Sequence, residues 1–137
     1  MDRRIGIDLG SVSAKVVLID DGRITSAVYR RHHGKPLDAL VGILSDLRGW
    51  QGRSAAFTGS ASGKASGAAG CETVNEVVAL AAAVPKYCPE VNSVIEMGGQ
   101  DSKLLLFRNS PEGTVFDDFS MNSVCAAGTG SFLDQQA

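Results

Sequence analysis

The chain has 137 residues, of which 44% are apolar and 20% charged, as in an ordinary globular domain with its own core. Its formal net charge is −2, so nothing indicates a general affinity for nucleic acid or for an anionic membrane. The sequence has no signal-peptide pattern and no apolar run long enough to span a bilayer. We therefore expect a cytoplasmic protein that binds neither nucleic acid nor membrane.

The first part of the sequence predicts an antiparallel meander. Short apolar strands are expected over residues 5–8, 15–20 and 24–29. Asp21 and Gly22, between the last two strands, are a strong hairpin signal, because a type I′ turn needs positive φ at both positions.

A helix is predicted from Pro36 to about Gly49, because apolar residues recur there at helical spacing. A buried parallel strand is expected over residues 54–58. The stretch 58–70 is rich in Gly, Ala and Ser, which favours a loop. The apolar stripe of the helix consists of Leu37, Leu40, Val41, Leu44 and Leu47.

A second helix is expected after residue 70, with Thr73 or Asn75 as its N-cap. It should end near Ala83, because Pro85 follows and proline interrupts helical hydrogen bonding. Three more strands are predicted over residues 91–96, 103–108 and 114–119, and a final helix should begin near residue 130.

The predicted order of strands and helices runs twice, which indicates two copies of one supersecondary plan. We take residues 1–89 as the first lobe and residues 90–137 as the beginning of a second, truncated lobe. The last residues look like the opening of a helix, with no stop signal. We therefore expect an N-terminal fragment of a longer protein, inactive on its own.

The turn between the first two strands has the composition of a phosphate-binding loop. Backbone N–H groups in a turn of small residues can converge on an anion, and hydroxyl and ammonium groups add donors. An acid at the strand end suits hydrated Mg²⁺. The alternative is a hairpin whose small residues only make the turn. The residues concerned are Asp8, Gly10, Ser11, Ser13 and Lys15.

Residues 96–103 repeat this pattern of strand, acid, glycines and polar residues. The two glycines, Gly98 and Gly99, permit close approach of phosphate to the backbone. Gln100 could position an attacking water, and Asp101 could bind Mg²⁺ or orient that water. Glu96 could act as a further acid or base. The alternative is again a plain strand–turn–strand.

Two other segments carry weaker signals. Residues 59–65 resemble a P-loop, but the spacing of the glycines is one residue short and Ala65 follows Lys64, so we interpret them as a flexible surface loop. The basic run over residues 30–35 is interpreted as solvated.

Cysteine is scarce, and no Cys-x-x-Cys pattern is present, which argues against a disulfide framework or a complete cluster site within one chain. Cys125 precedes a Gly-Thr-Gly turn into a predicted helix, whose N-terminus would favour a thiolate able to bind iron. The alternative is a small buried side chain, the interpretation that we give to Cys71 and Cys88.

Three segments together resemble one family. Residues 5–15 (Ile-Gly-Ile-Asp-Leu-Gly-Ser-Val-Ser-Ala-Lys) resemble the first phosphate motif of the actin/Hsp70/sugar-kinase superfamily. Residues 95–103 (Ile-Glu-Met-Gly-Gly-Gln-Asp-Ser-Lys) resemble its second phosphate motif. With Asn-Ser-Val-Cys-Ala-Ala-Gly-Thr-Gly at residues 122–130, the chain resembles the BadF/BadG/BcrA/BcrD-type ATPases. These include the activators of 2-hydroxyacyl-CoA dehydratases and ATPase subunits of benzoyl-CoA reductase.

The resemblance implies an α/β, ribonuclease-H-like fold with a mixed sheet and two lobes that bind ATP and Mg²⁺. It also implies a homodimer that shares one [4Fe–4S] cluster, with Cys125 as one ligand and a second cysteine downstream. ATP hydrolysis would then drive a low-potential electron into a CoA-ester dehydratase or reductase. The residues at Glu96 and before Cys125 resemble the long, fused activase-type members.

On this resemblance Asp8 would bind Mg²⁺, and Gly10, Ser11, Ser13 and Lys15 would hold the phosphates. Gly98, Gly99, Gln100 and Asp101 would clamp the γ-phosphate and the attacking water. Two alternatives stay open: a small-molecule kinase of the same superfamily, and a lobe that binds nucleotide or a partner without chemistry.

Overall fold

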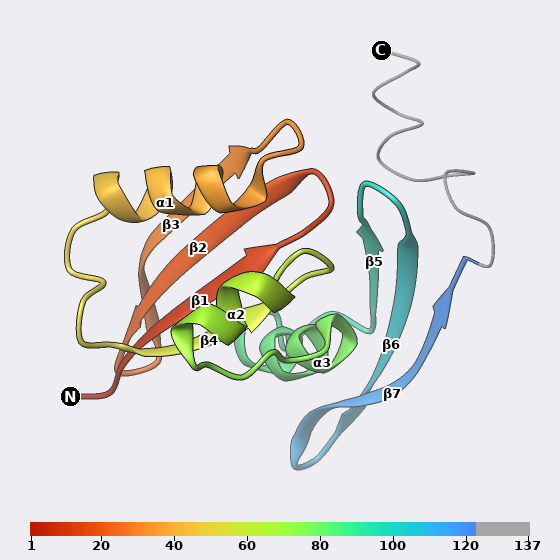
Figure 1. Cartoon of the computed structure of the whole chain (residues 1–137). Helices are drawn as coiled ribbons and strands as arrows, with labels where there is room; N and C mark the ends of the chain where they lie inside the picture. Colours follow the sequence, from red (N-terminus) through yellow and green to blue (C-terminus); the bar gives the residue numbers. More distant parts are fainter. Residues whose placement is uncertain (123–137) are drawn as a thin grey trace. The chain divides into compact units, whose positions relative to one another are not determined.

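The computed structural model of the chain describes residues 1–122 (Figure 1). Two compact units divide the chain: Met1–Val74, and a second unit that begins at Asn75. The first helix after Val74 thus groups with the second unit, while the lobe boundary at residues 89 and 90 stays a prediction.

The first unit contains a four-stranded sheet with the strand order β3-β2-β1-β4. Strands β1, β2 and β3 pair antiparallel and β4 pairs parallel with β1, so both the predicted meander and the parallel strand are confirmed. Only Phe57 of β4 is buried, because β4 lies at the sheet edge. The strands are β1 (Arg3–Leu9), β2 (Ser13–Asp20), β3 (Arg23–Arg31) and β4 (Ser54–Thr58).

The turn from β2 to β3 is the predicted hairpin turn. Asp21 and Gly22 have φ angles of 48° and 79°, as a type I′ turn requires. The Asp21 carboxylate accepts a hydrogen bond from the backbone N–H of Asp2 at 2.8 Å. This contact ties the N-terminus of the chain to the hairpin.

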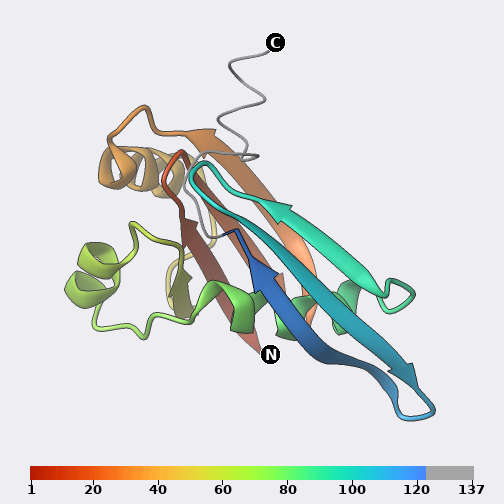
Figure 2. The ribbon, with the colours of Figure 1, turned by 90° about the vertical axis from the view of Figure 1, so that its right-hand side faces the viewer.

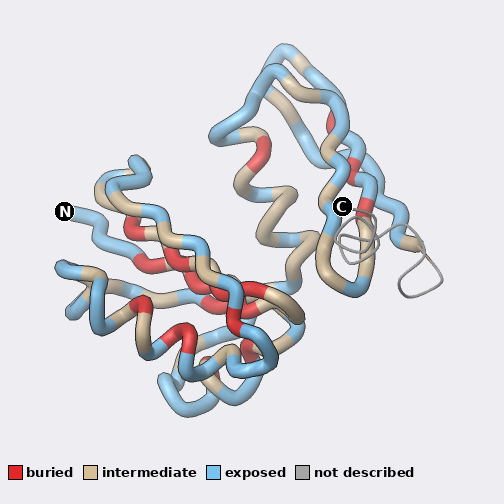
Figure 3. The backbone as a smooth tube through the Cα atoms, turned by 90° about the horizontal axis from the view of Figure 1, so that it is seen from above, coloured by how far each residue is buried: buried red, intermediate tan, exposed pale blue. Residues whose placement is uncertain are grey.

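The core of the first unit lies between the sheet and helix α1 (Pro36–Asp46). Alternate residues of β1 and β2 are buried, as the period of a strand with one covered face demands. Figure 3 marks buried positions in red. The cluster consists of Ile5, Ile7, Leu9, Ala14, Val16, Leu18, Ala39, Leu40, Ile43 and Phe57.

The predicted apolar stripe of α1 is confirmed in part. Leu40 is buried, and Leu44 and Leu47 pack against the core, as expected. Leu37 and Val41 are instead exposed by 42% and 63%. Ala39 and Ile43 are buried in addition, so the core face is shifted toward these two residues.

The prediction of a loop over residues 58–70 is wrong for its second half, which forms helix α2 (Gly63–Ala69). Buried hydroxyl groups stabilise this turn-rich segment: Ser62 donates to the Gly59 carbonyl at 2.7 Å, and Ser66 donates to the Gly63 carbonyl at 3.1 Å. The helix ends at Gly70 in the left-handed conformation. Composition suggested a loop because Gly and Ser disfavour helices, but tertiary contacts override that propensity: Ala61 and Ala65 pack against the core, and Thr73 donates to the Ser66 hydroxyl at 2.8 Å.

The second unit begins with helix α3 (Glu76–Tyr87), and Asn75 is its N-cap, as predicted. The helix continues past Ala83 with Pro85 inside it, contrary to the prediction. Proline removes only its own N–H, and the helical bond from Cys88 N–H to the Val84 carbonyl, at 2.8 Å, closes the last turn. Val84 is buried against Leu105 and Phe107, which stabilises this turn by burying apolar surface.

Strands β5 (Ser93–Met97), β6 (Ser102–Ser110) and β7 (Gly113–Met121) form an antiparallel sheet in that order (Figure 2). All three were predicted, with ends that differ by one or two residues. On β6, Lys103, Leu105 and Phe107 are buried and alternate with exposed positions. The opposite face exposes apolar side chains, namely Ile95, Met97, Leu104 and Leu106.

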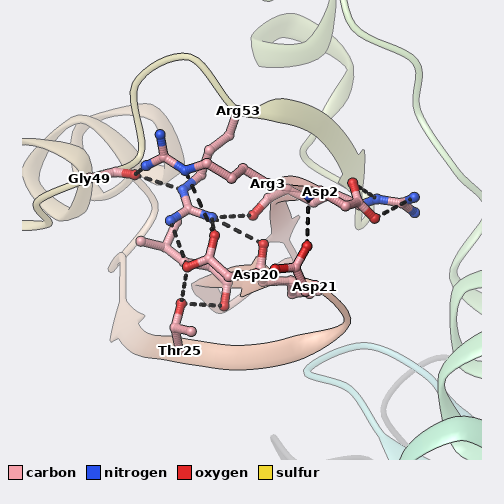
Figure 4. Close-up of polar contacts among 10 residues, drawn as sticks. Asp2, Arg3, Asp20, Asp21, Thr25, Gly49 and Arg53 are labelled. Atoms are coloured by element: carbon pink, nitrogen blue, oxygen red, sulfur yellow. Dashed lines mark hydrogen bonds and ion pairs between the residues drawn. The ribbon is translucent and has the colours of Figure 1, made fainter.

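One buried arginine joins the strand ends of the first sheet that lie opposite the β1–β2 turn (Figure 4). The Arg53 side chain is 4% exposed and contacts both carboxylate oxygens of Asp20, at 2.6 and 3.1 Å. It also donates to the carbonyl of Gly49 at 2.6 Å. This Arg53 network holds these strand ends together.

Within the described residues, no helix is long and apolar enough to cross a membrane.

Candidate functional site

The first candidate loop connects β1 to β2 and is closed by a hydrogen bond from Gly10 N–H to the Ser13 carbonyl, at 3.0 Å. Ser13 is buried, whereas Ser11 is partly exposed. A Cβ at Gly10 would meet only ordinary contacts, the nearest being Ser13 O at 3.6 Å. Packing within the protein therefore does not require glycine here, and the missing side chain leaves the backbone open to a ligand.

Asp8 and Lys15 are paired across β1 and β2 beside this loop. The Lys15 ammonium lies 2.7 Å from Asp8 Oδ2, and the two side chains remain 44% and 31% exposed. A cation already contacts the carboxylate that was predicted to bind Mg²⁺. Because Mg²⁺ usually takes one or two protein carboxylates and keeps its waters, this donor set fits a hydrated Mg²⁺ if Lys15 moves to the phosphates.

Thr58, the last residue of β4, and Gly59, which follows it, lie beside Asp8 on the neighbouring strand. Thr58 is the register partner of Asp8, and within the described residues its buried hydroxyl has no hydrogen-bond partner. Gly59 has a φ of +97°, and a Cβ there would lie 2.5 Å from Asp8 Oδ1 and overlap the Leu9 carbonyl. The sequence marked Gly59 only as part of a false P-loop, so its role behind Asp8 was missed.

His32 holds the first loop from the end of β3. The interpretation of the basic run as solvated is wrong for this residue, which is 7% exposed. Gly34 N–H donates to His32 Nδ1 at 3.1 Å, so the ring hydrogen lies on Nε2, which donates to the Gly10 carbonyl at 3.0 Å. The His32 backbone N–H donates to the Val12 carbonyl at 3.1 Å. The neutral imidazole therefore braces the loop backbone.

The second candidate loop, between β5 and β6, is closed in the same way. Gly98 N–H donates to the Asp101 carbonyl at 2.8 Å. A Cβ at Gly98 would lie 2.8 Å from Asp101 Oδ1 and 3.1 Å from the Asp101 carbonyl oxygen, so a side chain here would displace Asp101. Gly99 and Gln100 complete the turn, which confirms the predicted turn at the two glycines.

Lys103 gathers three carboxylates beside the second loop. Its Nζ lies 2.9 Å from Glu76, 3.0 Å from Glu96 and 3.0 Å from Asp101. Burial alone would lower the pKa of Lys103, but hydrogen bonds to Glu76, Asp101 and Glu96 outweigh it and raise the pKa above its ordinary value. Lys103 is therefore charged throughout the physiological range. The sequence placed Lys103 in the motif but gave no sign that Glu76 would join it.

The structure thus groups Asp8, Gly10, Ser13 and Lys15 in the first unit, and Gly98, Asp101 and Glu96 in the second. Over residues 1–122, no set of three or more His, Cys, Asp or Glu side chains could hold a metal ion. Cys125 lies outside the described residues. Cys71 and Cys88 are free thiols, and Cys88 is exposed, so its interpretation as a buried side chain is wrong.

Comparison with known proteins gives matches along nearly the whole chain. The 2-hydroxyisocaproyl-CoA dehydratase activator of Clostridioides difficile is 31% identical over 139 residues, which cover 97% of this chain and 50% of that protein. The (R)-2-hydroxyglutaryl-CoA dehydratase activating ATPase of Acidaminococcus fermentans is 31% identical over 140 residues, which cover 97% and 52%. The chain spans about half the length of the curated relatives it matches.

The fold gives the same result. A solved structure of the activator of the 2-hydroxyisocaproyl-CoA dehydratase from Clostridium difficile, with bound ADPNP, matches with a TM-score of 0.76 and 29% identity. The match covers 97% of this chain and 50% of that one, and it confirms the predicted α/β, actin-like ATPase fold. The sequence profile of the BadF/BadG/BcrA/BcrD ATPase family matches residues 5–137, so the chain belongs to that family.

Proposed function

We propose that the intact protein is an ATP-dependent activator that delivers a low-potential electron from a [4Fe–4S] cluster to a CoA-ester dehydratase or reductase. The observation that carries this proposal is the family match over residues 5–137, together with relatives named as activators of CoA-ester dehydratases. The ADPNP bound in the activator from Clostridium difficile supports ATP as the nucleotide.

In the first loop, Asp8 would hold Mg²⁺ through its waters. Gly10 would let the phosphates approach the loop backbone closely, and the hydroxyls of Ser11 and Ser13 would donate to them. Lys15 is 44% exposed and lies on a flexible stem, so it can exchange the Asp8 carboxylate for a phosphate oxygen. The hydrogen bond from His32 to the Gly10 carbonyl would keep this backbone in place during that exchange.

In the second loop, Gly98 and Gly99 carry no side chain and would let the γ-phosphate approach the backbone closely. Gln100 would hold the attacking water, and Asp101 would orient that water or contact Mg²⁺. Phosphoryl transfer needs little covalent help from a protein, so catalysis by positioned donors and charges suits such a pair of loops.

We further propose that Cys125 is a cluster ligand and that two copies of the protein share the cluster in a homodimer. When bound, the cluster supplies the electron that the partner enzyme accepts. Cys71 and Cys88 are the cysteines that we leave without a role.

The test uses the full-length protein, purified without oxygen. We expect a brown protein with about two iron and two sulfide ions per chain, since one four-iron cluster would be shared by two chains. It should hydrolyse ATP. A colourless protein that transfers phosphate to a small-molecule acceptor would replace this proposal with the kinase. A protein that binds nucleotide without turnover would replace it with the non-catalytic lobe.

A further inference from the structure

The most heavily paired charge in the described part of the second unit is Lys103, on β6 at the edge of the second loop. Its side chain is 3% exposed, and an unpaired ammonium in such a place would be strongly destabilising. An ammonium has three N–H donors, and three carboxylates lie within 3.0 Å of Nζ. All of its hydrogen-bonding capacity is therefore used by Glu76, Glu96 and Asp101.

This arrangement separates Lys103 from Lys15. Lys15 is 44% exposed and has one carboxylate partner, so it can turn toward a phosphate. Lys103 is buried and would have to give up buried ion pairs to do the same. Its chemistry is thus to hold acids in place, and two of those acids, Glu96 and Asp101, belong to the loop itself.

The third acid gives Lys103 an anchor outside the loop. Glu76 is the first residue of α3, whose N-terminus is fixed by the Asn75 cap. The Glu76 carboxylate lies 2.9 Å from Lys103 Nζ, the shortest of the three contacts. Lys103 therefore holds the Asp101 carboxylate and is itself held by Glu76 at the start of α3.

We propose that Lys103 is a positioning residue of the second loop, which holds the Asp101 carboxylate ready for Mg²⁺ or water while Glu76 anchors Lys103 to α3. This inference rests on the proposed function, because it assigns the second loop to the γ-phosphate. One ammonium faces three carboxylates, so the cluster keeps a formal charge of −2. That surplus would repel a bare triphosphate and favour the nucleotide that arrives with a divalent cation.

The experiment compares Glu76→Gln and Lys103→Met in the full-length protein, with Glu90→Gln as the matched control. Glu90 is an exposed glutamate of the same unit, so its substitution tests the loss of one negative charge. Each variant is first checked by thermal unfolding. Steady-state ATP hydrolysis then gives kcat and KM for MgATP.

We expect Glu76→Gln to lower kcat about tenfold with KM for MgATP within about twofold, because orientation and not ground-state binding is lost. Glu90→Gln should match the wild type. Lys103→Met should lower kcat further, again with little change in KM for MgATP, because it releases both loop carboxylates, Glu96 and Asp101.

A purely structural role would lower the unfolding temperature without separating kcat from KM in the folded protein. If both variants fold and keep the wild-type kcat, Lys103 has no positioning role, although the proposed function stands. If Lys103→Met does not fold, the kcat of Glu76→Gln decides alone. If the wild-type protein hydrolyses no ATP, the proposed function fails, and this inference is overturned with it.

Discussion

Gly59→Ala tests whether the close approach of Gly59 to Asp8 and to the Leu9 backbone is needed for stability and for the position of Asp8. Gly59 has a φ of +97°, where a side chain costs about 1–2 kcal/mol or more. The new Cβ would also lie 2.5 Å from Asp8 Oδ1 and overlap the backbone of Leu9. Backbone cannot move aside as a flexible side chain can, so this overlap adds about 1–3 kcal/mol. We expect a total loss of about 2–5 kcal/mol in the free energy of unfolding.

Gly52→Ala is the matched control. Gly52 has a φ of +70°, and nothing lies within 4 Å of its Cβ position, so this variant carries the backbone strain without the overlap. Denaturant unfolding of both variants therefore isolates the overlap as a difference of about 1–3 kcal/mol. ATP hydrolysis by the intact protein should fall in the folded fraction of Gly59→Ala and not in Gly52→Ala, because only Gly59 abuts Asp8. Equal destabilisation with normal ATPase activity in both would refute this reasoning.

Three other predictions follow from the first unit. Asp8→Asn should lower ATP hydrolysis by the intact protein about 10²-fold with an unchanged unfolding temperature, because the amide has no charge for Mg²⁺; wild-type turnover would remove Asp8 from the site. Thr58→Val should raise the free energy of unfolding by about 1 kcal/mol and lower ATP hydrolysis, since the buried hydroxyl has no partner among the described residues; a less stable variant would mean that the hydroxyl is satisfied. The hydrogen bond from Arg53 lowers the pKa of Asp20, although burial opposes this shift. The ionised Asp20 therefore stabilises the fold fully above the ordinary carboxyl pKa of about 4, and this stabilisation is lost as the pH falls through the lower pKa of the folded state. Thermal unfolding should therefore separate Asp20→Asn from the wild type at pH 7 and bring them together in strong acid, whereas an equal gap at both would contradict the role of Arg53.

Local patterns in the sequence were sufficient for most of the fold. The type I′ turn at Asp21 and Gly22 needs positive φ, which is a property of the residues themselves, and the alternation of apolar residues fixed β1 and β2. The helix over Gly63–Ala69 was missed because Ala65 packs against the core and Thr73 donates to Ser66, contacts that only the folded chain provides.

The candidate site, like the fold, could be predicted from the sequence only in part. Asp8 and Lys15 could be predicted as partners, because a short turn between antiparallel strands brings them together. The contacts of His32 and Glu76 with the two loops could not be predicted, because these residues lie far from the loops in the sequence. A histidine within a basic run looks solvated until the fold buries it.

The most direct test of the proposed function is the Cys125→Ser variant of the full-length protein, purified without oxygen beside the wild type and a Cys88→Ser control. Cys88 is an exposed free thiol, so its substitution controls for the loss of a cysteine. We predict that Cys125→Ser loses its iron, its cluster absorption and electron delivery but still binds ATP, while Cys88→Ser keeps them all. A complete [4Fe–4S] signal in Cys125→Ser would contradict the proposal that Cys125 holds the cluster.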